Sequence, residues 1–191
     1  MLKVNGTEIK NVKFNGVDLD KVLVSGVIVF EKVQFNNTVT MRILQDSITI
    51  TVQTKDLSPC EVWNAGNKIG VLNNYQSTSI PIPNKNEAVI IKGKDITSLD
   101  CSSNQLTNLN VQGLNSLQSL NCSSNQLTAQ NFKNIFNNLL QTENGEAVVY
   151  NDNDNNYKDF TRPPELVEAF NGAKARGWKF YKNYVSDINL L

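Results

Sequence analysis

Histidine is absent from this chain of 191 residues, and cysteine is scarce. The lack of histidine removes the commonest general base and the commonest catalytic metal ligand, and it excludes every triad that depends on histidine. The three cysteines, Cys60, Cys101 and Cys122, show no C-x-x-C spacing. Their odd number argues against a complete disulfide framework, and their spacing argues against a zinc site. We therefore expect a protein that is not an enzyme and that holds no metal and no cofactor.

Long apolar runs and an excess of one charge sign are also missing. The chain has 18 Lys and Arg residues against 18 Asp and Glu residues, so its formal net charge is zero. A neutral chain has no general electrostatic attraction to nucleic acid or to an anionic membrane. Residues 1–20 lack the apolar core of a secretory signal, and no run approaches the roughly 18 apolar residues of a membrane span. We expect synthesis in a cytoplasm, no nucleic-acid binding and no membrane insertion.

The first segment, residues 1–32, carries a short repeat of its own. Gly6, Gly16 and Gly26 each follow an Asn or a Ser, and β-branched or apolar residues alternate around them. Asn-Gly between alternating hydrophobic residues is a strong hairpin signal, so this segment is predicted to form three turns that link short strands. So small an element has little apolar surface. It either packs on the next segment or pairs with another chain, and the pattern leaves both alternatives open.

The second segment, residues 33–95, also has the alternation of β-strands. Polar and apolar residues alternate over 38–43 and 47–52, and further strands are predicted near 78–82 and 88–91. Pro81 and Pro83 place the third of these strands at a sheet edge. A small antiparallel sandwich is predicted, with Cys60 and Trp63 in its core.

The third segment, residues 96–191, begins with the clearest pattern in the chain. Residues 96–106 and 117–127 share the spacing [IL]-x-x-L-x-C-S-S-N-Q-L. This spacing is the leucine-rich-repeat pattern. The Leu and Cys of each copy alternate on a strand and are predicted to point inward, which makes Cys101 and Cys122 small apolar core residues. The Asn of each copy is predicted to supply hydrogen bonds to buried backbone groups where the strand turns.

The same spacing is extended by two later stretches. Val148 and Tyr150 before Asn153, and Trp178 and Phe180 before Asn183, predict two more strands with these apolar residues inward. Helices are predicted between the strands over 129–140 and 164–176. The predicted fold class is α+β: a short leucine-rich-repeat solenoid of about four coils, with parallel strands and two helices, over residues 96–191. Small antiparallel β domains over 1–32 and 33–95 are predicted to precede it.

Candidate binding residues follow from this predicted register. The residues that alternate with the core residues face the concave surface of the repeats, and these candidates are Asp100, Ser102, Asn121, Ser123, Val149, Asn151, Lys179 and Tyr181. Such a polar row suits sugar hydroxyls or a protein loop, and it equally suits a plain solvated face. The carboxylates of Asp152 and Asp154 lie in a run that resembles a calcium loop. The run lacks the glycine and the bidentate glutamate of such a loop, so a polar turn is predicted there.

The repeats resemble those of bacterial and phage surface leucine-rich-repeat proteins that carry the variant L-x-C-S-x-N-Q-L-T. The stretch from Ala173 to Phe180 resembles the closing strand A-x-x-x-K-G-W-x-V of that group, with Arg176 in place of the Lys and Phe180 in place of the Val. The resemblance covers about residues 96–184.

The N-terminal segment is similar to a short opening module of phage structural proteins, from Val4-Asn5-Gly6 to Val29-Phe30-Glu31. This resemblance implies a virion protein on the particle surface, such as a head fibre, a capsid decoration or a tail-associated appendage. Residues 1–32 would then attach to other virion proteins of the capsid or tail, or would form a homo-oligomer. The repeats would contact a host-surface glycan or protein. The alternative is a bacterial cell-surface or secreted adhesion module, which the missing secretory signal disfavours.

Overall fold

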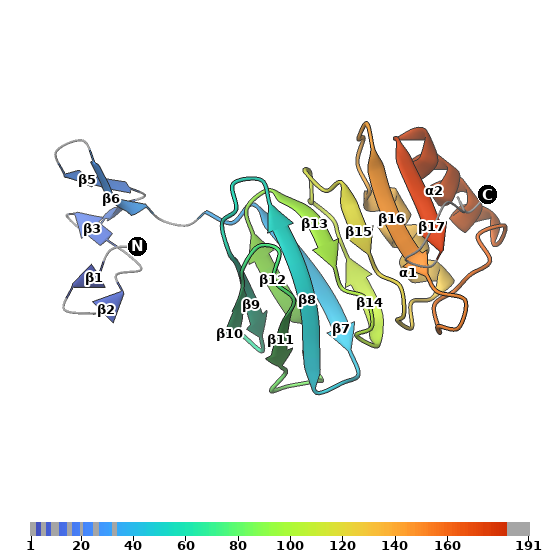
Figure 1. The fold of residues 1–191 in the computed structure, drawn as a ribbon, viewed down its shortest axis with the longest axis horizontal. Coiled ribbons are helices and arrows are strands. Elements are labelled where there is room, and N and C mark those ends of the chain that lie inside the picture. The colour runs from blue at the N-terminus through green and yellow to red at the C-terminus, as the bar shows by residue number, and fades with distance from the viewer. Residues whose placement is uncertain are drawn as a thin grey trace. The chain divides into compact units, whose positions relative to one another are not determined.

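The computed structural model describes residues 3–4, 7–8, 12–14, 17–19, 21–24, 27–31 and 34–182, with side chains described for 34–182. The chain divides into two compact units, Met1–Gln34 and Phe35–Leu191. Figure 1 shows the elements of both units.

The first unit contains three antiparallel pairs of short strands: β1 (Lys3–Val4) with β2 (Thr7–Glu8), β3 (Val12–Phe14) with β4 (Val17–Leu19), and β5 (Lys21–Val24) with β6 (Val27–Glu31). These pairings confirm the three predicted hairpins. The Asn-Gly and Ser-Gly dipeptides that were predicted as their turns lie outside the described residues.

The second unit is built on two sheets. A five-stranded antiparallel sheet has the order β10-β9-β12-β7-β14, and a six-stranded mixed sheet has the order β11-β8-β13-β15-β16-β17. The strands of the five-stranded sheet are β7 (Asn37–Ile43), β9 (Cys60–Asn64), β10 (Asn67–Leu72), β12 (Val89–Gly93) and β14 (Leu106–Asn110). Those of the six-stranded sheet are β8 (Ser47–Thr54), β11 (Thr78–Pro81), β13 (Ile96–Asp100), β15 (Ser119–Asn121), β16 (Gly145–Tyr150) and β17 (Trp178–Lys182).

The alternation in the sequence is the reason for these strands. In β7 the buried side chains are Val39, Met41 and Ile43, and the intervening side chains are exposed or half-buried. β8 and β12 alternate in the same way, which confirms the predicted strands, and β11 lies at a sheet edge as its prolines predict. One face of each sheet is therefore apolar, and the two apolar faces bury one another.

The predicted α+β fold with a separate leucine-rich-repeat solenoid is wrong. β13, from the first repeat, pairs antiparallel with β8 and parallel with β15 from the second repeat, so both repeats belong to a sheet that begins with earlier strands. The stretch that follows the first repeat is β14, which pairs antiparallel with β7 in the other sheet. Within the described part of the second unit the fold is mostly β, with 11 strands in two mixed or antiparallel sheets and two helices. The repeat pattern specifies inward side chains, but it does not specify which strand edge the backbone will pair with.

Two helices cover the part of the six-stranded sheet that the five-stranded sheet does not reach. Helix α1 (Ala129–Asn138) contacts β14 and packs on α2 (Pro164–Ala175), which in turn contacts β17 (Figure 1). Helix α1 begins with a capping box, in which Thr128 and Asn131 exchange hydrogen bonds with each other's backbone. Both helices lie where the sequence predicts them, because their apolar residues recur with helical spacing.

A row of inward side chains crosses the parallel strands of the mixed sheet. Leu99, Leu120, Ala147 and Phe180 are partners in register, and all four are buried. Trp178 and Phe180 point inward as predicted, whereas Asn183 lies outside the described residues.

The predicted register of β16 is wrong by one residue. Ala147 and Val149 occupy the inward positions, and Val148 is half-buried on the other face. Tyr150 is buried, but against Phe160 beyond a register shift at the end of the strand. A one-residue slip exchanges the two faces of a strand, so this correction moves Val149 from the predicted binding face into the core.

Candidate functional site

The predicted binding residues on β13 and β15 form a hydrogen-bonded network on the outer face of the six-stranded sheet. The Asn121 amide donates to Asp100 at 3.1 Å, and the Ser102 hydroxyl donates to the same carboxylate at 2.7 Å. The Ser123 hydroxyl donates to Asn121 Oδ1 at 2.8 Å. These side chains hold one another in place, so each has fewer groups left for a ligand.

The remaining predicted residues divide between the same face and the core. The Asn151 amide donates to the Ser124 hydroxyl at 2.6 Å and to the Ser123 hydroxyl at 3.5 Å, and the second bond extends the network to the residue after β16. Lys179 is exposed, and the Tyr181 hydroxyl lies 3.5 Å from a Glu146 carboxylate oxygen. Val149 is fully buried in the core and cannot contact a ligand on this face.

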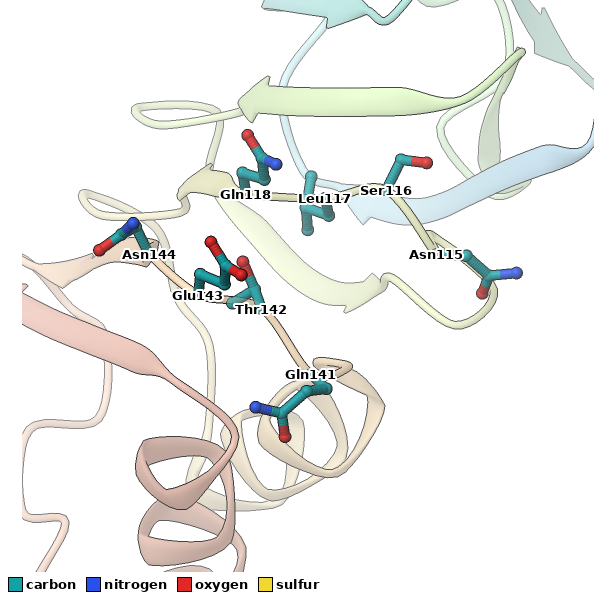
Figure 2. A pocket seen from close by; sticks show the side chains of 8 residues that line it. All are labelled: Asn115, Ser116, Leu117, Gln118, Gln141, Thr142, Glu143 and Asn144. Carbon is teal, nitrogen blue, oxygen red and sulfur yellow. The ribbon is translucent and has the colours of Figure 1, made fainter.

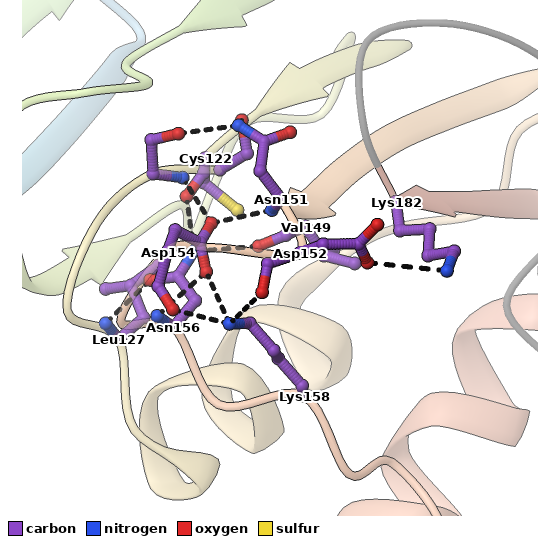
Figure 3. Close-up of polar contacts among 11 residues, drawn as sticks. Cys122, Leu127, Val149, Asn151, Asp152, Asp154, Asn156, Lys158 and Lys182 are labelled. Atoms are coloured by element: carbon purple, nitrogen blue, oxygen red, sulfur yellow. Dashed lines mark hydrogen bonds and ion pairs between the residues drawn. The ribbon is translucent and has the colours of Figure 1, made fainter.

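A buried carboxylate links the loops that follow β15 and β16 (Figure 3). Asp154 Oδ2 accepts the backbone N–H groups of Ser124 at 2.6 Å and Asn151 at 2.7 Å, and Oδ1 accepts that of Asn156 at 3.0 Å. The Lys158 ammonium lies 3.6 Å away, and the Asp154 side chain is 5% exposed. Three fixed donors and one cation occupy this carboxylate, so its role is structural.

Asp152 does not share this arrangement, although it lies only two positions before Asp154. Its carboxylate lies 3.4 Å from the Lys182 ammonium instead. The two carboxylates therefore engage different cations and do not form an acid–base pair, and the stretch is the polar turn that the sequence predicts.

Buried asparagines connect successive turns of the chain. Asn125 Nδ2 donates to the carbonyl oxygens of Cys101 and Cys122, and its Oδ1 accepts the N–H groups of Asn104 and Leu106. This confirms the predicted role of the repeat asparagines. At the next turn, Asn156 makes the equivalent bonds: its Nδ2 donates to the carbonyls of Cys122 and Val149, and its Oδ1 accepts the Leu127 N–H. The sequence predicted Asn153 for this position, but Asn153 is exposed.

The three cysteines are free and buried. Burial raises the pKa of the Cys60 and Cys122 thiols to about 12, and it also raises the pKa of Cys101 well above its ordinary value. The reactive thiolate therefore does not form near neutral pH, and these residues act as small apolar core residues, as predicted.

Two hollows lie at opposite ends of the parallel strands, each with a volume of about 300 Å³. The first, which we call the loop pocket, lies before β15 and β16 and is lined by Asn115, Ser116, Leu117, Gln118, Gln141, Thr142, Glu143 and Asn144 (Figure 2). The second, the turn pocket, is lined by Gln105, Ser124, Asn125, Gln126, Asn151, Asn153, Asp154 and Asn155. The sequence analysis missed the loop pocket, because all of its residues except Leu117 and Gln118 lie outside the repeat pattern.

The described residues form neither a metal site nor a membrane-spanning helix. Within them no three His, Cys, Asp or Glu side chains are grouped so that they could hold a metal ion. No helix among them has the length and apolar character that crossing a membrane requires. Comparisons with known proteins give no significant match to any family model, curated protein or solved structure. The functional argument therefore depends on the residues and their contacts.

Proposed function

We propose that this protein is a non-enzymatic structural component of a phage virion: a head fibre, a capsid decoration or a tail-associated appendage. Residues 1–32 attach it to other virion proteins and hold the copies of a homo-oligomer together. The second unit stands at the virion surface and contacts a host-surface glycan or protein. The observation that carries this proposal is the division of the chain at residue 34. It separates a small hairpin unit, whose sequence resembles opening modules of phage structural proteins, from a larger β unit.

The chemistry of the second unit supports a display role. The outer-face carboxylate of Asp100 accepts bonds from Ser102 and Asn121, and the Asp154 carboxylate accepts three backbone bonds. These acidic groups and the buried thiols are all committed to the fold. A unit whose polar groups stabilise one another suits the presentation of a surface better than it suits catalysis.

The start of the second unit, at Asn36, supports an attachment role for residues 1–32. Asn36 exchanges two hydrogen bonds with Asp95, one through its amide at 2.6 Å and one through its carbonyl at 2.9 Å. The neighbouring loop is tied to this point, because the Lys55 N–H donates to the Asp95 carbonyl at 3.0 Å. The chain therefore enters the second unit at a fixed position.

The same end carries exposed apolar side chains. Leu57 is 60% exposed and Tyr75 is 65% exposed. Asn74 holds their two loops together, since its amide donates to the Ser58 carbonyl at 2.9 Å and its carbonyl accepts the Thr54 N–H at 2.6 Å. Exposed apolar groups beside an attachment point suit contact with a protein partner.

Immunogold electron microscopy on lysates of the source, with antibody against residues 35–182, tests the proposal. Label on phage heads or tails is the expected result, and it would also distinguish a head protein from a tail protein. Label on cell envelopes with bare particles would overturn the proposal in favour of a bacterial surface adhesion module.

Deletion of residues 1–32 tests the attachment role separately. The shortened chain should keep the circular dichroism spectrum of the second unit but should be lost from purified particles. Light scattering of the two purified proteins should show that the deletion also abolishes self-association. Normal incorporation of the shortened chain would contradict the role of this segment.

A further inference from the structure

The loop pocket differs from the hydrogen-bonded network of Asp100, Ser102, Asn121 and Ser123 in having side chains that are not committed to the fold. Figure 2 shows residues 115–118 along one side of the pocket and residues 141–144 along the other. In the part of the chain that the structure describes, none of the polar side chains along these two walls makes a hydrogen bond to another residue. Their donors and acceptors are therefore free for a ligand.

The wall formed by residues 141–144 is held rigidly from behind. The Arg176 guanidinium donates to the carbonyls of Leu139 at 2.7 Å and Phe136 at 2.6 Å, and the Trp178 indole N–H donates to the carbonyl of Leu140 at 2.8 Å. The Thr142 N–H donates to the Arg176 carbonyl at 2.9 Å. These bonds fix the backbone of this wall without using the side chains that line the pocket.

Gly177 shows how closely the wall is packed. Its φ is +92°, and a Cβ at this position would lie 1.9 Å from the Thr142 carbonyl oxygen. Only glycine permits this backbone approach, so the wall cannot move away without disturbing the start of β17.

The facing wall is also fixed through its backbone. The Gln118 N–H donates to the Thr97 carbonyl at 2.8 Å, and the Gln118 carbonyl accepts the Glu146 N–H at 2.8 Å. The Asn37 amide donates to the Gly113 carbonyl at 2.8 Å, which anchors the loop that leads to this wall. Two rigid walls with free polar side chains form a pocket that needs little ordering when a ligand binds.

We propose that the loop pocket binds an uncharged saccharide. This inference rests on the proposed function, because the saccharide would belong to the host surface. The amide side chains of Asn115, Gln118, Gln141 and Asn144 each offer both donors and acceptors, and every sugar hydroxyl also acts as both. Leu117, which is buried, supplies an apolar floor for the carbon face of a ring.

The charge and the size of the pocket select this ligand class. Among the described residues that line the pocket, Glu143 is the only charged one, so none of them attracts a sulfate, a phosphate or a sialic acid carboxylate. A volume of about 300 Å³ lies at the lower end of small-ligand pockets. Such a pocket holds one or two sugar rings, whereas a folded protein partner needs a contact area of roughly 800 Å² on each side.

The turn pocket offers a matched control, because it has a similar volume but only part of its lining is free of hydrogen bonds within the fold. Asn125, Asn151 and Asp154 in its lining all hold the fold together through hydrogen bonds. Its remaining amides, including Gln126 and Asn153, lie at the opposite end of the same strands from the loop pocket. Replacing two of these amides by alanine tests whether the loss of any exposed amide pair weakens saccharide binding.

The experiment is an array of neutral, N-acetylated, sulfated and sialylated oligosaccharides, probed with the purified full chain. The strongest binder is then titrated against the wild type, a Gln118→Ala/Gln141→Ala double variant and a Gln126→Ala/Asn153→Ala control. Binding to neutral or N-acetylated glycans is expected, with about a tenfold or greater loss in the first variant and less than about a twofold change in the control. Matching melting temperatures of the three proteins would show that all are folded.

A Glu143→Gln variant sharpens the test of charge. An uncharged saccharide should bind this variant within about threefold of the wild type, since an amide keeps one acceptor of the carboxylate. A tenfold loss would indicate an amine-bearing ligand and would overturn the proposal.

Other outcomes overturn it as well: a blank array, binding confined to acidic glycans, or equal losses in the loop-pocket and control variants. The experiment uses the isolated protein, so its result does not depend on where the protein is located. Failure of the saccharide inference would leave immunogold label on particles unaffected, and absence of that label would leave a measured saccharide affinity in place.

Discussion

The two halves of the inner face of the six-stranded sheet are covered in different ways. β8 and β13 face the five-stranded sheet, and the core there is aliphatic, with Ile48, Ile50 and Val52 of β8 all buried. β16 and β17 face the helices, and the core there is aromatic. Its ring contacts join Phe132, Phe136, Phe160, Phe170 and Phe180 at centroid distances between 4.9 and 5.7 Å.

The covering layer therefore decides which side chains fill the core. A facing sheet brings a row of side chains close over its whole width, whereas a helix presents one convex stripe and leaves wider gaps on either side. Ala147, Ala169 and Ala173 are the small residues that let the phenylalanines reach into those gaps. At the seam, β14 belongs to the five-stranded sheet and also contacts α1, so the core continues without a break.

Truncation of Phe136, in the helix-covered half, should cause the largest loss of stability. Its ring contacts four other phenylalanines, so Phe136→Ala should lower the free energy of unfolding by about 3–5 kcal/mol. Urea unfolding followed by circular dichroism measures this loss. In the sheet-covered half, Ile50→Val removes only one methyl group and should cost about 1 kcal/mol. Similar losses for the two variants would mean that the aromatic cluster is not the centre of its half.

The elements of the second unit could be predicted from the sequence where local pattern is sufficient. Alternation identified β7, β8 and β11, and helical spacing identified α1 and α2. The pairing of β13 with β8 could not be predicted in this way, because backbone hydrogen bonds join segments far apart in the chain and carry no side-chain signature. The fold class was wrong for this reason, although the inward residues of both repeats were right.

The register of β16 shows a second limit. Ala147, Val148, Val149 and Tyr150 are all apolar, so alternation cannot decide which face is buried. The asparagines that follow, at positions 151, 153, 155 and 156, are equally hard to distinguish, and only the contacts identify Asn156 as the buried one. The loop pocket was missed because most of its residues lie in loops that carry no periodic signal, and only Leu117 and Gln118 belong to the repeat.

Removal of the Asn125 amide should weaken the seam between the two halves. Asn125→Ala leaves three carbonyls and two N–H groups without this partner in a buried place, so a loss of about 2–4 kcal/mol is expected. Thermal and chemical denaturation measure it. Asn153→Ala, at the asparagine that the sequence pattern favoured, should change stability by less than about 0.5 kcal/mol because its side chain is exposed. A loss at Asn153→Ala as large as that at Asn125→Ala would instead place Asn153 in the buried row of asparagines that the sequence predicts.

A pair of Val→Thr variants should test the faces of β16 more finely. Val149 is fully buried, so the hydroxyl of Val149→Thr enters an apolar core and should cost about 1–2 kcal/mol. Val148 is half-buried on the outer face, and Val148→Thr should be nearly neutral because threonine suits a strand and its hydroxyl reaches water. Equal unfolding midpoints for the two variants would show that β16 does not have one buried face.

The smallest effect is expected from an exposed ion pair at the end of the sheet-covered half. Hydrogen bonding by Ser58, followed by that of Lys94, holds the pKa of Asp56 below its usual range. The lowered pKa means that this stabilisation is present above the unfolded-state pKa of about 3.9 and is lost as the pH falls from there through the folded-state pKa. The side chains of Asp56 and Lys94 are 42% and 46% exposed, so solvent screening limits the contribution to roughly 0.5 kcal/mol. The unfolding free energies of the wild type and Asp56→Asn should therefore differ slightly at pH 7 and converge as the pH falls from about 3.9 through the folded-state pKa, since protonation removes the charge that the variant lacks. A difference that grows on acidification would mean that the carboxylate destabilises the folded state, contrary to its contacts with Ser58 and Lys94.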